Sequence, residues 1–125
     1  MAWLENPLPY HQIAAPCSLC CEVAMWICLN DSFLSIVSDR NTPNLLLVRS
    51  RRSGDIEAVF PDAKVIENLR TDYKYRASID RKKVAAAIAD RAMHIDYSNF
   101  KNSVDDQERH DAYLNIWLTI YRFQC

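Results

Sequence analysis

Two pairs of polar side chains in this 125-residue chain have the chemistry that general acid–base catalysis needs. Tyr73 and Arg76 are close in the sequence, and His110 and Asp111 are neighbours. Tyr and His can transfer protons and Arg can hold an anion, so these four residues are catalytic candidates if the fold brings them into one pocket. A metal-dependent phosphohydrolase would need more His and Asp ligands than a chain with 3 histidines offers. No active site is completed, and a binding protein is favoured over an enzyme.

Cationic side chains indicate a candidate binding surface instead. Arg49 and Arg51 alternate on one predicted strand, and Lys74 and Arg76 alternate on another. If these strands are neighbours, the four cations form a patch that can bind phosphate or an acidic protein surface. The alternative is that they are neutralised by the acidic residues Glu57 or Asp62.

A polar and aromatic segment, from Asp96 to Lys101, connects the two predicted C-terminal helices. Because loops often carry binding residues on a rigid scaffold, Tyr97, Asn99 and Lys101 are further ligand-binding candidates. The same segment also suits a structural clamp, in which Asn99 caps backbone groups and Tyr97 is a buried anchor. The sequence favours the clamp for Asp96 and Asn99.

Nucleic-acid binding is not favoured by the charge or by the strand pattern. Lys and Arg number 15 against 16 Asp and Glu, so no overall positive charge attracts nucleic acid. Tyr73 and Tyr75 could stack on bases, but strict alternation would send them to the face opposite Lys74 and Arg76. The single glycine, Gly54, excludes Gly-rich nucleotide-binding loops.

The cysteines give no sign of a metal site or of a cofactor. Their number is odd and no secretory signal precedes them, which favours a reducing cytoplasm. Cys17 and Cys20 form one CxxC pair, but no second pair follows, so neither a metal nor a cofactor is predicted. The apolar run before Met25 is broken by Pro16 and Glu22, so no membrane segment is expected.

Hydrophobic periodicity and turn residues predict an α+β domain. The predicted strands are residues 26–37, 45–48, 63–69 and 73–79, and the first of them contains a bulge or turn at Asn30 and Asp31. The predicted helices begin at Ser53, at Asp80 and at about Asp105. This order, ββαββα(α), predicts a four-stranded antiparallel sheet with helices on one face, a circular permutation of the ferredoxin-like plan.

The last predicted helix carries an apolar stripe that is typical of a buried face. The stripe consists of Tyr113, Ile116, Trp117, Ile120 and Tyr121. If it packs in the core, Trp117→Ala should cost roughly 3–5 kcal/mol of stability.

Residues 1–24 are predicted to be a poorly ordered extension outside a single domain of residues 25–125, and the alternative is a flexible arm with a redox or metal role. They lack periodicity and hold three prolines, Pro7, Pro9 and Pro16, before a clear strand pattern begins at Met25. Their deletion should shift the melting temperature by only a few degrees, equivalent to ~1 kcal/mol.

Three blocks carry a resemblance to a known family. They are Asp72-Tyr73-Lys74-Tyr75-Arg76, Ile95 to Lys101, and Arg109 to Trp117, with Met25-Trp26 at the start. In these blocks the chain resembles a family of small uncharacterised bacterial proteins with DYxYR, IDYxNFK and RHDAYxxVW patterns. The resemblance covers residues 25 to about 124 and implies kinship, but no activity.

These observations favour a non-enzymatic binding or regulatory module that recognises a protein or an anionic ligand through its sheet face and the 96–101 segment. A homodimer through the sheet is a further expectation, because an open sheet face is a common dimerisation surface. The alternatives are a small enzyme with a Tyr/Arg/His/Asp site, or an inhibitor or accessory protein of a mobile element.

Overall fold

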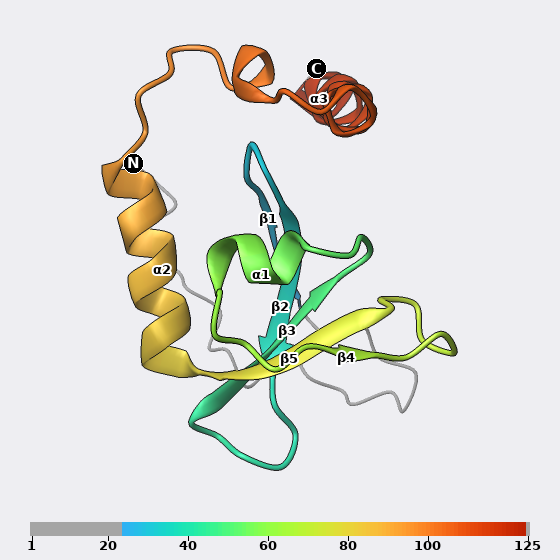
Figure 1. Cartoon of the computed structure of the whole chain (residues 1–125). Helices are drawn as coiled ribbons and strands as arrows, with labels where there is room; N and C mark the ends of the chain where they lie inside the picture. Colours follow the sequence, from blue (N-terminus) through green and yellow to red (C-terminus); the bar gives the residue numbers. More distant parts are fainter. Residues whose placement is uncertain (1–23, 125) are drawn as a thin grey trace, which may run out of the picture.

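Residues 24–124 are the part of the chain that the computed structural model describes, and they form an antiparallel sheet with helices (Figure 1). The strands are β1 (Met25–Cys28), β2 (Phe33–Ser38), β3 (Leu45–Ser50), β4 (Ile66–Glu67) and β5 (Tyr75–Asp80). The helices are α1 (Asp55–Val59), α2 (Arg81–Met93), the short 3-10 helix η3 (Lys101–Ser103) and α3 (Gln107–Gln124). Apart from Ala24, the predicted N-terminal extension lies outside the described residues.

The sheet has the strand order β1-β2-β3-β5-β4, and every neighbouring pair is antiparallel. Two successive hairpins build β1, β2 and β3. The chain then crosses through α1 to β4 and returns as β5, which inserts between β3 and β4. β3 and β4 therefore run parallel to one another on either side of β5.

The α+β class and the antiparallel sheet are confirmed, but the prediction of four strands is wrong. The N–H of Leu29 donates to the carbonyl of Ser32 at 2.8 Å, which closes a tight turn through Asn30 and Asp31. Residues 25–28 consequently fold back onto 33–36, with Met25 opposite Ile36, and the single predicted strand becomes two. The permuted ferredoxin-like arrangement stays a prediction.

β5 begins at Tyr75, two residues later than predicted. A turn rich in hydrogen bonds precedes it: Asn68 Oδ1 accepts the N–H of Arg70, and the Asn68 carbonyl accepts the N–H of Thr71. Because this turn extends through Lys74, Tyr73 lies outside the strand and does not follow its alternation.

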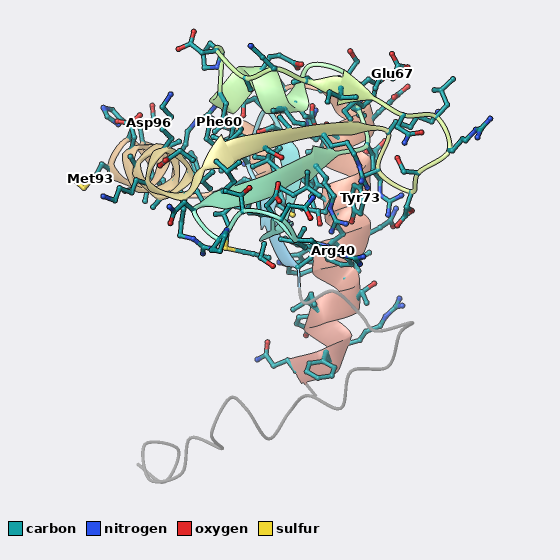
Figure 2. All side chains as sticks on the ribbon, turned by 90° about the horizontal axis from the view of Figure 1, so that it is seen from below. Arg40, Phe60, Glu67, Tyr73, Met93 and Asp96 are labelled. Atoms are coloured by element: carbon teal, nitrogen blue, oxygen red, sulfur yellow. The ribbon has the colours of Figure 1, made fainter. Side chains whose placement is uncertain are left out.

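α3 lies across the end of the sheet, beyond the β1–β2 turn, and is seen nearly end-on in Figure 1. Its cap is Asp106, whose Oδ1 accepts the N–H of Arg109 at 2.8 Å, so the helix begins slightly later than predicted. Figure 2 shows that its C-terminal half extends past the strands. The prediction of a buried stripe is therefore wrong beyond Tyr113: Trp117 is 47% exposed and Ile120 is 62% exposed.

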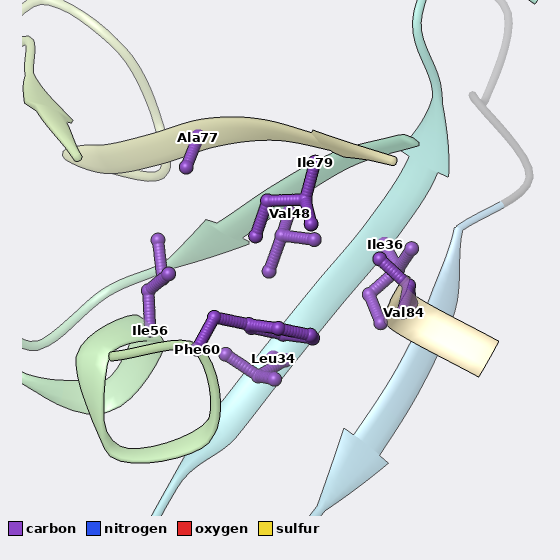
Figure 3. Packing of buried hydrophobic residues seen from close by; sticks show 8 residues of the cluster. All are labelled: Leu34, Ile36, Val48, Ile56, Phe60, Ala77, Ile79 and Val84. Carbon is purple, nitrogen blue, oxygen red and sulfur yellow. The ribbon is translucent and has the colours of Figure 1, made fainter. Parts of the chain in front are cut away.

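The core lies between one face of the sheet and the helices α1 and α2 (Figure 3). Its buried members are Leu34, Ile36, Val48, Ile56, Phe60, Ala77, Ile79 and Val84. Residues two apart in β2 and in β5 point to the same face, so the alternation of these strands places their apolar side chains in this layer. None of the helices described between residues 24 and 124 is long and apolar enough to cross a membrane.

The chain's only glycine begins α1. Gly54 is the N-cap residue with φ of 93°, and no side chain caps the helix there. Residues with a Cβ pay about 1–2 kcal/mol in this left-handed region, which explains glycine at this position. The predicted helix start at Ser53 is therefore two residues too early, and it is Asp55 that starts the helix and enters the site described next.

Candidate binding site

Tyr73 is the centre of the candidate site. This residue is 4% exposed, and the guanidinium carbons of Arg49 and Arg51 lie 4.7 Å and 4.3 Å from the centroid of its ring. Guanidinium groups at this distance are attracted by the electrons of an aromatic ring. The turn before β5 thus places Tyr73 beside Arg49 of β3 and Arg51 of the loop that follows β3, and Tyr73 does not take the strand position that strict alternation predicted.

Two cavities adjoin at this residue and share the walls Trp26, Arg51 and Tyr73. The first has a volume of about 450 Å³ and lies between the sheet and α3. Figure 2 labels Tyr73 at the place where the sheet approaches α3. The residues that line the first cavity are Trp26, Phe33, Arg51, Arg52, Asp55, Tyr73, Glu108, Arg109, Ala112, Tyr113 and Ile116. The second, of about 510 Å³, is lined by Ala24, Trp26, Arg49, Arg51, Asp72 and Tyr73.

Aromatic and aliphatic side chains make much of the wall of the first cavity. Trp26 and Phe33 meet edge to face with their centroids 6.1 Å apart, and Ile116 and Ala112 face them from α3. Trp26 is 68% exposed, so this wall is open to a partner. Concave sites that combine aromatic walls with a few polar groups are typical ligand sites.

Two arginines of the loop after β3 supply the accessible positive charge of the first cavity. Arg51 contacts Asp72 at 3.9 Å and donates to the Asp72 carbonyl at 3.4 Å, and Arg52 pairs with Asp106 at 3.2 Å. All four side chains are about half exposed or more. Exposed pairs of this kind contribute little stability, so an incoming carboxylate can replace Asp72 at small cost.

The floor of the first cavity is a buried ion pair. Arg109 Nη2 lies 2.6 Å from Asp55 Oδ1 and Nη1 lies 3.0 Å from Oδ2, and both side chains are less than a tenth exposed. The hydrogen bonds that Arg109 donates to Asp55 raise the pKa of the Arg109 guanidinium. Asp55 Oδ2 also accepts the N–H of Phe33 at 3.0 Å. This charge pair is internally satisfied, and it fixes α3 to α1 and to the start of β2.

Tyr113 is the second attachment of α3. Its hydroxyl lies 2.9 Å from the carbonyls of both Leu29 and Ser32, so it can donate to either end of the β1–β2 turn. Phe100 stacks on its ring with centroids 5.6 Å apart. Burial raises the pKa of Tyr113 to about 12, because the phenolate would lose its hydration.

This raised pKa predicts a loss of stability in alkali. An unfolded tyrosine ionises near pH 10, so the contribution of Tyr113 is complete below that pH and is lost as the pH rises through about 12. Between about pH 9 and pH 11, we expect the free energy of unfolding to fall in the unsubstituted chain by about 1 kcal/mol more than it falls in Tyr113→Phe. Urea unfolding of both proteins at the two pH values measures this difference.

The comparison of the two proteins cancels the effect of other groups that titrate in alkali. Burial also raises the pKa of the Cys28 thiol, but Cys28 is present in both proteins. Parallel pH profiles of the two proteins would contradict the prediction.

The other predicted cations are only partly brought together. Arg49 is buried, donates from Nη2 to Ser35 Oγ at 2.8 Å, and lies opposite Arg76 on β5. Arg49 and Arg76 line a third cavity, of about 390 Å³, on the sheet. Lys74 is exposed in the turn before β5 and lines none of the three cavities. The four cations therefore do not form one cluster. Arg49 and Arg51 line the second cavity, Arg49 and Arg76 line the third, and Lys74 lies apart from both.

The catalytic candidates do not share a cavity. Tyr73 lines the first and second cavities and Arg76 lines the third, whereas His110 and Asp111 line none of these. His110 Nδ1 lies 3.4 Å from Asp111 Oδ1 in the first turn of α3, where the Asp111 side chain is exposed. None of these three cavities brings the four residues together.

The segment from Asp96 to Lys101 positions α3 and does not line the cavities. Asn99 Oδ1 accepts the N–H of Asn102 at 3.3 Å, and Tyr97 contacts the ring of Phe100. Lys101 Nζ lies 4.4 Å from the centroid of the Trp117 ring. The hydrogen bond of Asn99 agrees with the structural clamp, whereas Tyr97 is only half-buried and Asp96 is exposed.

Three residues of the site were missed by the sequence analysis. Trp26 and Phe33 were assigned only to a strand, and Arg52 was not singled out. Trp26 carries a usable signal, since a tryptophan on an edge strand often marks a contact surface. Nothing local in the sequence indicates that Arg52 reaches α3.

Within residues 24–124, no group of three or more His, Cys, Asp and Glu side chains is arranged as metal ligands are. Cys28 is the one cysteine in that range, and Cys17, Cys20, Cys21 and Cys125 lie outside the described residues. The predictions about the cysteine-rich segment therefore stay predictions.

Comparisons of the chain with models of protein families, with curated proteins and with solved structures give no match.

Proposed function

We propose that this domain is a non-catalytic binding module whose first cavity accepts an apolar or aromatic side chain from an acidic segment of a partner protein. The aromatic wall receives the apolar side chain. Arg51 and Arg52 then lie beside the cavity, where they can meet the partner's carboxylates. Apolar anchors in a pocket with a charged rim are the usual plan of such interfaces.

The observation that carries the proposal is that Trp26, Arg51 and Tyr73 are shared by two adjoining cavities. An extended segment could therefore place one side chain in each cavity while its backbone passes over Arg51. Arg51 is held by stacking on the buried Tyr73, so its charge is positioned before a partner arrives. Pre-positioned groups lose less entropy on binding.

Single-stranded nucleic acid fits this site less well than a protein segment. Tyr73 is 4% exposed and is already contacted by two guanidinium groups, so it offers no open face on which a base could stack. A small enzyme is also less well supported, because Tyr73 lines the first cavity and Arg76 the third, whereas His110 and Asp111 line neither.

The test uses 3-phenylpropionate as a minimal ligand with one ring and one carboxylate. We expect saturable shifts of the Trp26 indole and Arg51 signals in NMR titration, with a Kd of about 1 mM for a ligand of this size. Propionate lacks the ring and 3-phenylpropanol lacks the charge, so each should bind at least about tenfold more weakly.

The variant Arg51→Gln should weaken 3-phenylpropionate about tenfold, because it removes the charge that meets the carboxylate. Arg70→Gln is the matched control, since Arg70 is an exposed arginine that lines neither cavity. Equal affinity for 3-phenylpropionate and 3-phenylpropanol, or equal loss in both variants, would overturn the proposal.

A further inference from the structure

α3 carries an apolar face that is longer than the rest of the described domain covers. The first half of this face, with Tyr113, packs on the β1–β2 turn and lines the first cavity. The second half is open to solvent: Ile116 is 43%, Trp117 47%, Ile120 62% and Phe123 89% exposed. Figure 2 shows this half of the helix extending beyond the strands.

These exposed side chains lie on one side of the helix. With 3.6 residues per turn, Ile116, Ile120 and Phe123 fall within about 60° of one another around the axis. Arg122 points about 160° away from Ile120, so the one charged residue of this half faces the opposite side. The helix thus contributes a continuous and uncharged face, and the ammonium of Lys101 lies beside it, over the Trp117 ring.

The face is large enough for a stable interface. From the exposed fractions, its aromatic and aliphatic side chains present roughly 500–600 Å² of apolar surface, at the upper end of what a monomer normally exposes. Two such faces in contact bury about 1,000 Å² in total, which is the size at which a specific interface becomes stable.

The composition of the face favours a second copy of the chain over a different protein. Residues 112–121 contain no charged side chain. Two-fold symmetry brings identical residues together, so an uncharged face avoids like-charge repulsion. Interfaces between different proteins, in contrast, use charges to select the partner, and permanent homodimer interfaces are more apolar.

We infer that two copies of this protein pair through the C-terminal halves of α3 about a two-fold axis, with Ile116, Ile120 and Phe123 of each copy at the centre. Because Ile116 also lines the first cavity, the second copy comes to lie beside the mouth of that cavity. This dimer does not depend on the proposed ligand, and it uses the helix and not the sheet face.

Sedimentation velocity of the full chain from about 1 to about 200 μM tests the inference, and we expect a concentration-dependent dimer. Ile120→Glu places two unpaired carboxylates at the symmetric centre and should raise the dimer Kd on the order of 100-fold. Ile120 is largely exposed in one copy, so the substitution should leave the fold intact, which the melting temperature checks.

Met93→Glu is the matched control. Met93 is an 83% exposed apolar residue at the end of α2, and its substitution adds the same charge away from α3. The dimer should form in Met93→Glu and be lost in Ile120→Glu and in Phe123→Glu. A full chain that sediments as a monomer at every concentration overturns the inference, and so does a dimer that both α3 variants leave unchanged.

Discussion

Replacing Asp55 by Asn should lower the free energy of unfolding by about 3 kcal/mol, one of the two largest losses that we expect from a single substitution in this chain. The asparagine keeps the shape of the side chain but removes the charge that compensates Arg109. Both partners are less than a tenth exposed, so the guanidinium would remain buried without a counter-ion. Asp55 also accepts the N–H of Phe33, and that hydrogen bond weakens when the acceptor becomes neutral.

Urea unfolding of Asp55→Asn, Arg109→Met and the double variant measures this effect. The double variant should be more stable than the sum of the two single losses predicts, because it leaves no unpaired charge. Arg52→Gln is the control, since its pair with Asp106 is about half exposed and its loss should be close to the error of the measurement. A loss of less than about 1 kcal/mol in Asp55→Asn would show that the charge pair does not hold α3 in place.

Leu34→Ala should cost about 3 kcal/mol, whereas Trp117→Ala should cost about 1 kcal/mol, although it removes a larger side chain. Leu34 is 1% exposed in the centre of the core, so its truncation leaves a cavity between the sheet and the helices. Trp117 is 47% exposed and rests on Tyr121 and Lys101, and the space that it leaves is open to water.

Both substitutions are best measured in the Ile120→Glu background, so that self-association through α3 does not contribute to the stability of Trp117. Urea unfolding then compares the two losses within one monomeric chain. A larger loss of stability for Trp117→Ala than for Leu34→Ala would indicate that Trp117 is a core residue, as the sequence pattern predicted.

The elements that local patterns determine were largely predictable. The alternation of Ala77 and Ile79 places them in the core, and Asp80 caps α2 by accepting the N–H groups of Lys82 and Lys83. These features depend on residues within one or two turns of each other, so the sequence carries them directly.

The parts of the site that depend on distant residues were not predictable. The position of Tyr73 between two arginines follows from where β5 begins, which the hydrogen bonds of the preceding turn decide. The stripe on α3 was recognised as apolar, but periodicity identifies a face and not what the face contacts. The partner of Arg109 could not be found either, since many acidic residues could have paired with it.

The pair between Asp55 and Arg109 also has a consequence for the order in which the chain folds. It joins residues 54 positions apart, whereas both N-terminal hairpins join near neighbours. Closing a loop of that length costs more chain entropy than closing a hairpin, and contacts between distant residues slow folding. We expect Asp55 to receive Arg109 only after α1 and the β1–β2 turn are in place. The docking of α3 would then be a late step, and the first cavity, which needs α3 as its wall, would form only when folding is nearly complete.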